Sequence, residues 1–381
     1  MANNNENKVL NVPHLRFPEF NGEWETKLIN DLAVVIGGGT PDTTIKSYWD
    51  GEIQWFTPSE IGKNKYVDSS LRTITEEGLN NSSAKLLPPN TILLSSRATI
   101  GECSLSLREC ATNQGFQCLV SKKCNVDFLY YLIQTKKRDL IRKSCGSTFL
   151  EISANEVRKI QVSVPTDVEQ QKIAGLLSLI DERIATQNKI IEDLKKLKSA
   201  IRKKMFSLLK DEYTESFEIN QLLDYEQPTA YIVANDEYST DTSLTPVLTA
   251  NKGFILGYTD EKFGIYQKGE CIIFDDFTMD AKYVSFPFKV KSSAIKILTA
   301  KPNVNLRFMF EYLSYWELKS EEHKRHYISE IASLVIELPS KERQSIIASL
   351  MTSLNSKLDI EAKTKIRYEE QKRYLLSQMF I

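Results

Sequence analysis

The fold of this chain is decided by a stretch that occurs twice: PTDVEQQKIAGLLSLIDERIATQNKIIEDLKKLKSAIRKKMF at residues 165–206 and PSKERQSIIASLMTSLNSKLDIEAKTKIRYEEQKRYLLSQMF at residues 339–380. The two copies align without a gap, and the residues at Pro165, Gln170 and Ile173 recur at a constant offset, as does the closing Met-Phe pair. Each copy follows a larger block with few helical signals. The chain is therefore organised as block, helix, block, helix, and a repeat of this kind sets the architecture before any local prediction.

Apolar residues inside each copy recur in alternating steps of four and three, which is the 3.5-residue period of a coiled-coil seam. Thr166-Asp167-Val168-Glu169 forms a capping box at the first start, and Ser340 is a good N-cap at the second. We predict two helices of about 40 residues, roughly 60 Å each. The seam residues are Ile173, Leu177, Ile180, Ile184, Ile191, Leu194, Ile201 and Met205 in the first helix, and Ile347, Met351, Leu354, Leu358, Tyr368, Leu375 and Met379 in the second.

Polar residues interrupt both seams at the same two levels, Gln187 with Glu361 and Lys198 with Lys372. Such interruptions fix the register at a cost in stability. A seam of this kind can pair two copies of the chain in a parallel dimer, or it can pair within one chain. Because this chain supplies two matching seams at high effective concentration, we favour an intrachain antiparallel coiled coil. Antiparallel pairing would place the two blocks at opposite ends of a rigid spacer.

Composition sets the remaining frame. With 381 residues, 41% hydrophobic and 26% charged, the chain has room for two globular domains besides the helices. It contains no apolar run of the ~18 to 20 residues that a membrane span needs, and the start at Met1–Lys8 lacks the apolar core of a signal peptide. We expect a cytoplasmic protein.

The cysteines and histidines give no sign of a metal centre or a disulfide framework. Five of the six cysteines lie in the first block and one in the second, and no Cys-x-x-Cys pair occurs, so reduced thiols are expected. The spacing of His323 and His326 could serve a metal ion, but a basic surface patch with Lys324 and Arg325 is the reading we favour. The formal net charge of −1 does not by itself favour nucleic-acid binding. The lysines near the end of the first helix are more typical of a solvated helix face.

The two blocks share a pattern of short strand-like runs followed by one helix. In the first block this helix begins at an Asn125 cap and is predicted to stop at Gly146; the second block has a similar helix from Asn305. We predict an α+β fold, with two similar globular domains separated by the two long helices. The predicted domains are residues 1–164 (first block with an N-terminal arm), 165–210 (central helix), 211–338 (second block) and 339–381 (C-terminal helix).

Motifs in the first block point to a known family. Their order and spacing, together with the Pro-x-x-x-Glu-Gln-Gln-Lys-Ile-Ala start of the first helix, resemble the DNA-specificity subunits of type I restriction-modification systems over nearly the whole chain. The second block departs from the first: it lacks the Gly-Gly-Thr-Pro segment and is similar to another branch of the family's recognition domains, with Pro246–Ala250, Lys252–Ile255 and Gly269–Phe277. The first-block motifs are Gly38–Pro41, Trp55–Pro58, Leu94–Gly101, Thr112–Phe116 and Gly146–Phe149.

The resemblance implies a sequence-specific DNA-binding subunit without catalytic activity. Each block would be a target recognition domain, and the helices would fix the spacing and dock two methyltransferase (M) subunits and the restriction (R) subunits. Readers on one side of duplex DNA are spaced by about one helical turn, roughly 34 to 36 Å. Because the blocks differ in sequence, the implied target is bipartite and asymmetric.

The chain shows no catalytic motif. An adenine methyltransferase needs a glycine-rich cofactor loop and an Asn-Pro-Pro-aromatic motif for the flipped base, whereas Pro88-Pro89-Asn90 has these residues in the wrong order. The run Gly37-Gly38-Gly39 lacks the Lys-Ser/Thr of a phosphate loop. No cofactor is therefore expected in this chain, and S-adenosylmethionine, ATP and Mg²⁺ would belong to the partner subunits.

Direct readout of double-stranded DNA needs hydrogen-bonding side chains on loops, with Lys and Arg on phosphates. Motif residues such as Thr40, Pro41, Asn113 and Gln114 are expected to be scaffold. The DNA-binding candidates are Lys63, Asn64, Lys65, Ser96, Arg97, Ser147 and Thr148 in the first block, and Lys252, Asp275, Asp276, Lys282, Tyr283, His323, Arg325 and Tyr327 in the second. Two alternative functions are a stand-alone methyltransferase or nuclease with this recognition architecture, and a coiled-coil scaffold that binds protein rather than DNA.

Overall fold

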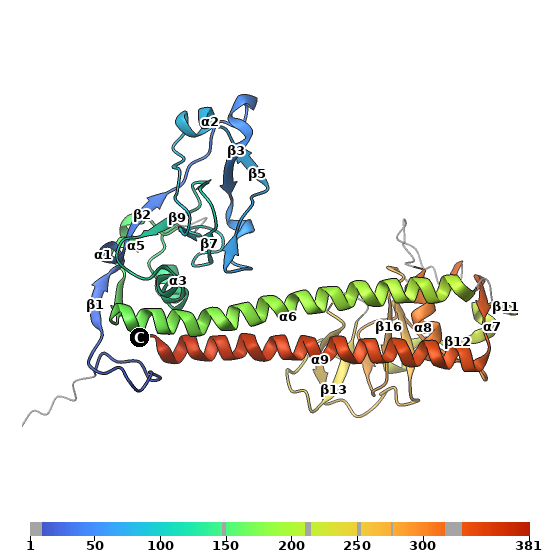
Figure 1. The fold of residues 1–381 in the computed structure, drawn as a ribbon. Coiled ribbons are helices and arrows are strands. Elements are labelled where there is room, and N and C mark those ends of the chain that lie inside the picture. Colours follow the sequence, from blue (N-terminus) through green and yellow to red (C-terminus); the bar gives the residue numbers. More distant parts are fainter. Residues whose placement is uncertain (1–9, 147–149, 210–214, 250–252, 276, 317–329) are drawn as a thin grey trace, which may run out of the picture. The chain divides into compact units, whose positions relative to one another are not determined.

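The computed structural model describes residues 10–146, 150–209, 215–249, 253–275, 277–316 and 330–381. The chain divides into two compact units, residues 1–189 with 362–381, and residues 190–361. Two long helices, α6 (Asp167–Leu208) and α9 (Lys341–Met379), contribute to both units (Figure 1). The two predicted long helices are therefore confirmed.

The helices pair in antiparallel fashion within each unit. In the first unit, the start of α6 packs with the end of α9 in one core, where Ile173 and Leu177 join Leu375 and Met379. In the second unit, the end of α6 packs with the start of α9. The predicted seam is buried or half-buried from Ile173 to Met205 and from Ile347 to Met379, whereas Leu208, which continues the spacing of the first seam, is 41% exposed. The 3.5-residue period thus identified the buried side of both helices.

Ahead of α6, the described part of the first unit has two sheets and a short strand pair. The central strand of its smaller sheet pairs antiparallel with one neighbour and parallel with the other. The pair joins β1 (Glu25–Leu28) to β10 (Gln161–Val164). The larger sheet has the order β2 (Ala33–Gly37), β9 (Gln117–Ser121), β6 (Ile92–Leu94), β7 (Cys103–Ser106) and β4 (Tyr66–Val67), and the smaller has β5 (Arg72–Ile74), β3 (Trp49–Phe56) and β8 (Cys110–Thr112).

Among its described residues, the first unit also has five short α-helices and two 3₁₀ turns. The helix α3 presents Phe128, Leu129 and Leu132 to the main core. The predicted continuation of this helix to Gly146 is wrong, because the backbone leaves helical geometry at Lys136 and a separate helix follows. The elements are α1 (Ile29–Leu32), α2 (Glu76–Asn80), α3 (Val126–Thr135), α4 (Lys137–Arg142) and α5 (Ala154–Arg158), with turns at Lys46–Tyr48 and Pro58–Glu60.

The second unit repeats this plan, with four described strands in its larger sheet where the first unit has five. Its smaller sheet again has a central strand with one antiparallel and one parallel neighbour, which agrees with two copies of one α+β fold. A strand pair again leads into the long helix. The strands are β11 (Glu215–Glu218) with β19 (Val335–Leu338); β12 (Leu223–Glu226), β18 (Ile295–Ala300), β15 (Cys271–Asp275) and β16 (Ala281–Val284); and β14 (Ile255–Thr259), β13 (Thr245–Leu248) and β17 (Lys289–Val290). The helices are α7 (Ile219–Leu222) and α8 (Leu306–Tyr315), with a turn at Pro228–Tyr231.

Candidate nucleic-acid interface

A buried glutamine fixes each block to its long helix. The Gln170 side-chain carbonyl accepts a hydrogen bond from the Asn125 amide at 2.9 Å, and its amide donates to the Pro165 carbonyl at 2.9 Å. Asn125 in turn caps α3 by accepting from the Phe128 amide. Paired buried polar groups can attach a block rigidly to a helix and so hold a recognition surface in place. We call the hydrogen bonds of Gln170 with Asn125 and Pro165 a glutamine mount.

The second unit repeats this arrangement atom for atom. Gln344 accepts from the Asn305 amide at 2.8 Å and donates to the Pro339 carbonyl at 2.9 Å, and Asn305 caps α8. The side chains of Gln170 and Gln344 are 3% and 1% exposed. The repeated glutamine detected in the sequence is therefore the part of the repeat that attaches each block.

In each unit a carboxylate with little exposure also joins the block to a long helix, but it lies on opposite partners in the two units. In the first unit the carboxylate is Asp181 of α6, which accepts from the Tyr131 hydroxyl at 2.6 Å. In the second unit it is Glu311 of α8, which is fully buried and accepts from Arg202 at 2.7 Å and from Asn355 at 3.2 Å. Burial raises the pKa of the Tyr131 hydroxyl. Both arrangements tie a block helix to α6 or α9.

The N-terminal arm binds to the start of α6 in the first unit. Arg16 donates two hydrogen bonds of 2.8 Å to Glu169, whose carboxylate also accepts from the Trp24 indole at 3.3 Å. The hydrogen bond with Glu169 raises the pKa of Arg16. The predicted capping box is not seen among the described residues, because the Glu169 carboxylate accepts from this arm instead of from the Thr166 amide. The arm also joins the chain ends, since the Leu15 amide donates to the Gln378 carbonyl at 2.9 Å.

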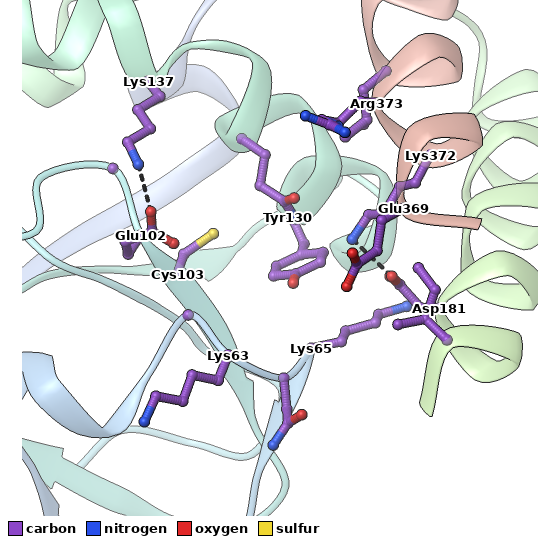
Figure 2. A pocket seen from close by; sticks show the side chains of 16 residues that line it. Lys63, Lys65, Glu102, Cys103, Tyr130, Lys137, Asp181, Glu369, Lys372 and Arg373 are labelled. Carbon is purple, nitrogen blue, oxygen red and sulfur yellow. Dashed lines mark hydrogen bonds and ion pairs between the residues drawn. The ribbon is translucent and has the colours of Figure 1, made fainter. Parts of the chain in front are cut away.

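Among the predicted DNA contacts of the first block, Lys63 and Asn64 are exposed on a loop. The loop is held in place because the Gly62 amide donates to Ser104, whose hydroxyl donates to the Asn64 carbonyl. Lys65 is different: its ammonium lies 2.6 Å from Asp127 and its side chain is 6% exposed. It points toward the long helices rather than into solvent (Figure 2).

Arg97 is partly exposed and forms an ion pair of 2.9 Å with Glu151. It can reach DNA only by leaving this partner or sharing it. Ser96, its neighbour, is completely buried, and its backbone amide donates to the Gly115 carbonyl at 2.8 Å. The prediction of a base contact therefore needs correction for Ser96, because a buried hydroxyl cannot meet a base edge in this conformation.

Asp275 of the second block requires the same correction. It is 4% exposed, and its carboxylate accepts from the amides of Phe277 and Thr278 and from the Thr278 hydroxyl. These bonds fix the turn between β15 and β16. The Asp275 side chain therefore stabilises the loop from within and does not lie on its outer surface. Aspartate commonly takes this role in turns.

Lys282 and Tyr283 lie on β16. Lys282 is partly exposed and pairs with Asp280 at 2.8 Å. The Tyr283 ring lies 3.5 Å beneath the Arg307 guanidinium, and burial raises the pKa of its hydroxyl. Of the two, only Lys282 carries a charge, and its partly exposed side chain can approach a phosphate. The candidates Ser147, Thr148, Lys252, Asp276, His323, Arg325 and Tyr327 lie outside the described residues.

The motif residues of the first block serve as scaffold in this structure. The Thr40 hydroxyl donates to the Gln114 side-chain carbonyl at 2.5 Å, and the Asn113 carboxamide accepts from the Gly115 amide. These bonds hold turns in place.

Sequence reasoning missed two apolar side chains that project into solvent. Leu71 is 86% exposed and Phe263 is 88% exposed. Both stand on braced loops: the Leu71 amide donates to Glu60 at 2.6 Å, and the Phe263 carbonyl accepts from the buried Lys289 at 2.6 Å. Only their exposure distinguishes these two side chains, and no periodic pattern in the sequence predicts that exposure.

No group of three metal-binding side chains occurs among the described residues. Within the same residues, no helix is both long enough and apolar enough to cross a membrane.

Comparisons with known proteins agree with this geometry. A family model described as "Type I restriction modification DNA specificity domain" matches residues 21–196 and again residues 212–370. The two matches cover both blocks and most of both long helices. The family assignment therefore rests on the repeat that organises the chain.

Several curated proteins are similar in sequence. The MjaIX type I restriction enzyme specificity subunit of Methanocaldococcus jannaschii is 38% identical over 216 residues, which is 55% of this chain and 50% of that protein. A type I restriction enzyme specificity subunit of Escherichia coli is 39% identical over 178 residues, 42% of this chain and 43% of that protein. The chain thus matches about half of the length of these two relatives.

A solved structure has the same fold. The crystal structure of a type I restriction-modification system S subunit from M. genitalium covers 97% of this chain and 99% of its own, with a TM-score of 0.65 and 17% identity. At this identity the likeness shows the fold alone, and it extends over both units and both long helices.

Proposed function

Because this chain belongs to the type I restriction modification DNA specificity family, we propose that it is the sequence-reading subunit of a type I restriction-modification complex. Residues 1–164 and 211–338 are its two target recognition domains, and they bind an asymmetric, bipartite site on double-stranded DNA. The observation that supports this most directly is the repeated mount, in which Gln170 and Gln344 attach two different blocks to paired helices through the same hydrogen bonds.

The proposed role is recognition without catalysis. Two methyltransferase subunits dock on the protein and restriction subunits join them; those partners use S-adenosylmethionine, ATP and Mg²⁺. The cytoplasm is the proposed place of action, because the DNA to be read lies there. Candidate DNA contacts with accessible side chains are Lys63, Asn64, Arg97 and Lys282.

The long helices act as the spacer. Helices of 42 and 39 residues would each extend roughly 60 Å at 1.5 Å per residue, longer than the roughly 34 to 36 Å that separates half-sites one turn apart. A paired, buried seam resists bending better than a flexible linker. The separation of the half-sites is therefore a property of the helices, and their base preference is a property of the blocks.

Methylation mapping tests this function. The chain is expressed alone, and together with candidate methyltransferase subunits, in cells without other adenine methylation, and modified adenines are located by single-molecule sequencing. A split asymmetric motif that appears only with the partner supports the proposal. Methylation by the chain alone would identify an enzyme, and the absence of any motif with every partner that binds it would favour a scaffold role.

Exchanging the first block tests its assignment. Replacing residues 13–164 with the corresponding block of a relative should change one half of the methylated motif and leave the other half intact. An unchanged motif would refute the modular reading.

A further inference from the structure

A polar cavity of about 650 Å³ lies within the first unit, between the Lys63 loop, α3 and the last turns of α9. Its walls include Lys63, Glu102, Tyr130, Asp181, Glu369 and Arg373 (Figure 2). Recognition-block residues line one side, and residues of the long helices line the other. A ligand here would touch both the reading domain and its mount.

Each carboxylate that lines this cavity already has a cationic partner. Glu102 pairs with Lys137, and Asp181 pairs with Lys372 at 2.7 Å; Figure 2 shows both pairs. Glu369 lies 3.4 Å from Lys365. The cavity therefore has no unpaired carboxylate to attract a cation.

Two cations of the cavity have no such partner. Within the described residues, Lys63 and Arg373 form no ion pair, whereas Lys65, Lys137 and Lys372 all do. A cavity with surplus donors and satisfied acceptors suits an anion.

The loop that carries Lys63 is packed closely against its neighbours. A side chain added at Gly62 would come within 2.8 Å of the Glu102 carboxylate, and one at Gly101 within 2.8 Å of the Lys137 side chain. Both glycines have positive φ angles, +88° and +87°. The two loops that carry Lys63 and Glu102 are thus packed against each other and against α4.

We propose that this cavity binds phosphates of the DNA backbone, with Lys63 and Arg373 as the contacts. The proposal rests on the proposed function and names a second, sequence-independent part of its DNA site. Arginine and lysine are the residues that proteins use for such contacts, which position the duplex without reading it. A phosphate held here joins the recognition block and α9 to the same DNA strand.

A free nucleotide offers the same phosphate chemistry but fits the cavity less well. The aromatic ring that lines it, Tyr130, is already packed against Tyr131 at 5.1 Å, with the Lys65 ammonium 5.8 Å from its centroid. A base would find no free aromatic face among the described lining residues, whereas a backbone needs none. We therefore assign the site to nucleic acid.

The test compares two double variants with equal loss of charge. Lys63→Gln with Arg373→Gln removes the proposed contacts. Lys85→Gln with Lys123→Gln removes two other exposed cations, which do not line the cavity. Both are assembled with the methyltransferase subunits, and circular dichroism melting checks that both are folded. Anisotropy with a labelled duplex that carries the mapped motif, and with a random-sequence duplex, is then measured over a salt series.

The cavity variant should weaken binding to both duplexes by the same factor. It should also make the slope of log K against log salt shallower by about 2, since each phosphate contact contributes about 0.9. The control variant should leave the slope within a few tenths of the wild-type value. A slope like that of the control, or a loss confined to the motif duplex, overturns the proposal. The single variant Arg373→Lys, with Lys63 intact, should keep most of the wild-type slope of log K against log salt.

A second arm separates the two sources of phosphate. Thermal unfolding of the wild type and the cavity variant is followed with and without millimolar ATP at constant ionic strength. Stabilisation of the wild type alone, with an unchanged salt slope, would reassign the cavity to a free nucleotide. Failure of the proposed function gives a different result. In that case no motif is methylated, but the salt slope measured with the random-sequence duplex still shows whether this cavity binds phosphate. A wild-type complex that binds neither duplex contradicts both.

Discussion

Asp181 of α6 and Lys372 of α9 form an ion pair of 2.7 Å in the first unit, and both side chains are largely buried, at 15% and 17% exposure. Asp181 also accepts from the Tyr131 hydroxyl of α3. One carboxylate therefore connects the two long helices and the recognition block. Lys372 is one of the polar residues that interrupt the predicted seam, and this pair is the reason that its charge can be accommodated there.

Replacing Asp181 by Ala should lower the free energy of unfolding by about 1 to 3 kcal/mol, because the Lys372 ammonium and the Tyr131 hydroxyl lose a buried partner. Urea unfolding measures the change. The double variant Asp181→Leu with Lys372→Met should cost less than the single change, since no charge is left unpaired. If the double variant loses as much stability as Asp181→Ala, or as much as the two single changes together, the pair does not act as a unit.

The glutamine mounts should be separable. Gln170→Leu leaves the Asn125 amide and the Pro165 carbonyl without their partner, and Gln344→Leu does the same to Asn305 and Pro339. Each should cost about 1 to 3 kcal/mol. In methylation mapping, each should relax discrimination mainly at the half-site of its own block. Loss at both half-sites from either variant would contradict independent mounts.

The thiols give a prediction for pH. Burial raises the pKa of Cys103, Cys110, Cys118, Cys124 and Cys271 to about 12. These groups stay protonated in the folded chain while the unfolded chain begins to ionise near its ordinary value of 9. The unfolded state then binds fewer protons, so stability should fall as pH rises from about 9 towards 12.

Thiol labelling checks the same environments at neutral to mildly alkaline pH. Cys145 is exposed, and it should react with Ellman's reagent within minutes. The other five should react only on unfolding, because thiolate is the reactive form and burial suppresses it. Rapid reaction of more than one thiol in the folded chain would contradict the buried core.

How much could be predicted from the sequence depended on whether the signal was periodic. The seam from Ile173 to Met379 follows from spacing alone, and the α+β class follows from the block pattern. Non-local contacts carry no such signal: Gln170 stood out as a repeated residue, but its partner Asn125 lies far away in the chain. Glu169 matched a capping box, yet Arg16 and Trp24 compete successfully for its carboxylate.

The candidate site was less accessible for the same reason. Ser96 and Asp275 have the polar character of base contacts, but the fold uses them inside turns and strand ends. Arg373 has the sequence context of an ordinary solvated helix position. Only the pairing of its neighbouring charges in three dimensions sets it apart.

We infer that the paired helices set the distance between the two half-sites. Deleting one heptad from each helix tests this inference. Removing residues 187–193 and 359–365 keeps the seam in phase and shortens each helix by about 10 Å, or about three base pairs at roughly 3.4 Å each. Single-molecule methylation mapping with the methyltransferase partner is the measurement. We expect methylation at the native spacing to disappear and any new motif to keep both half-sites with a spacer shorter by about three base pairs. Methylation that persists at the native spacing in a folded, partner-bound variant would contradict it.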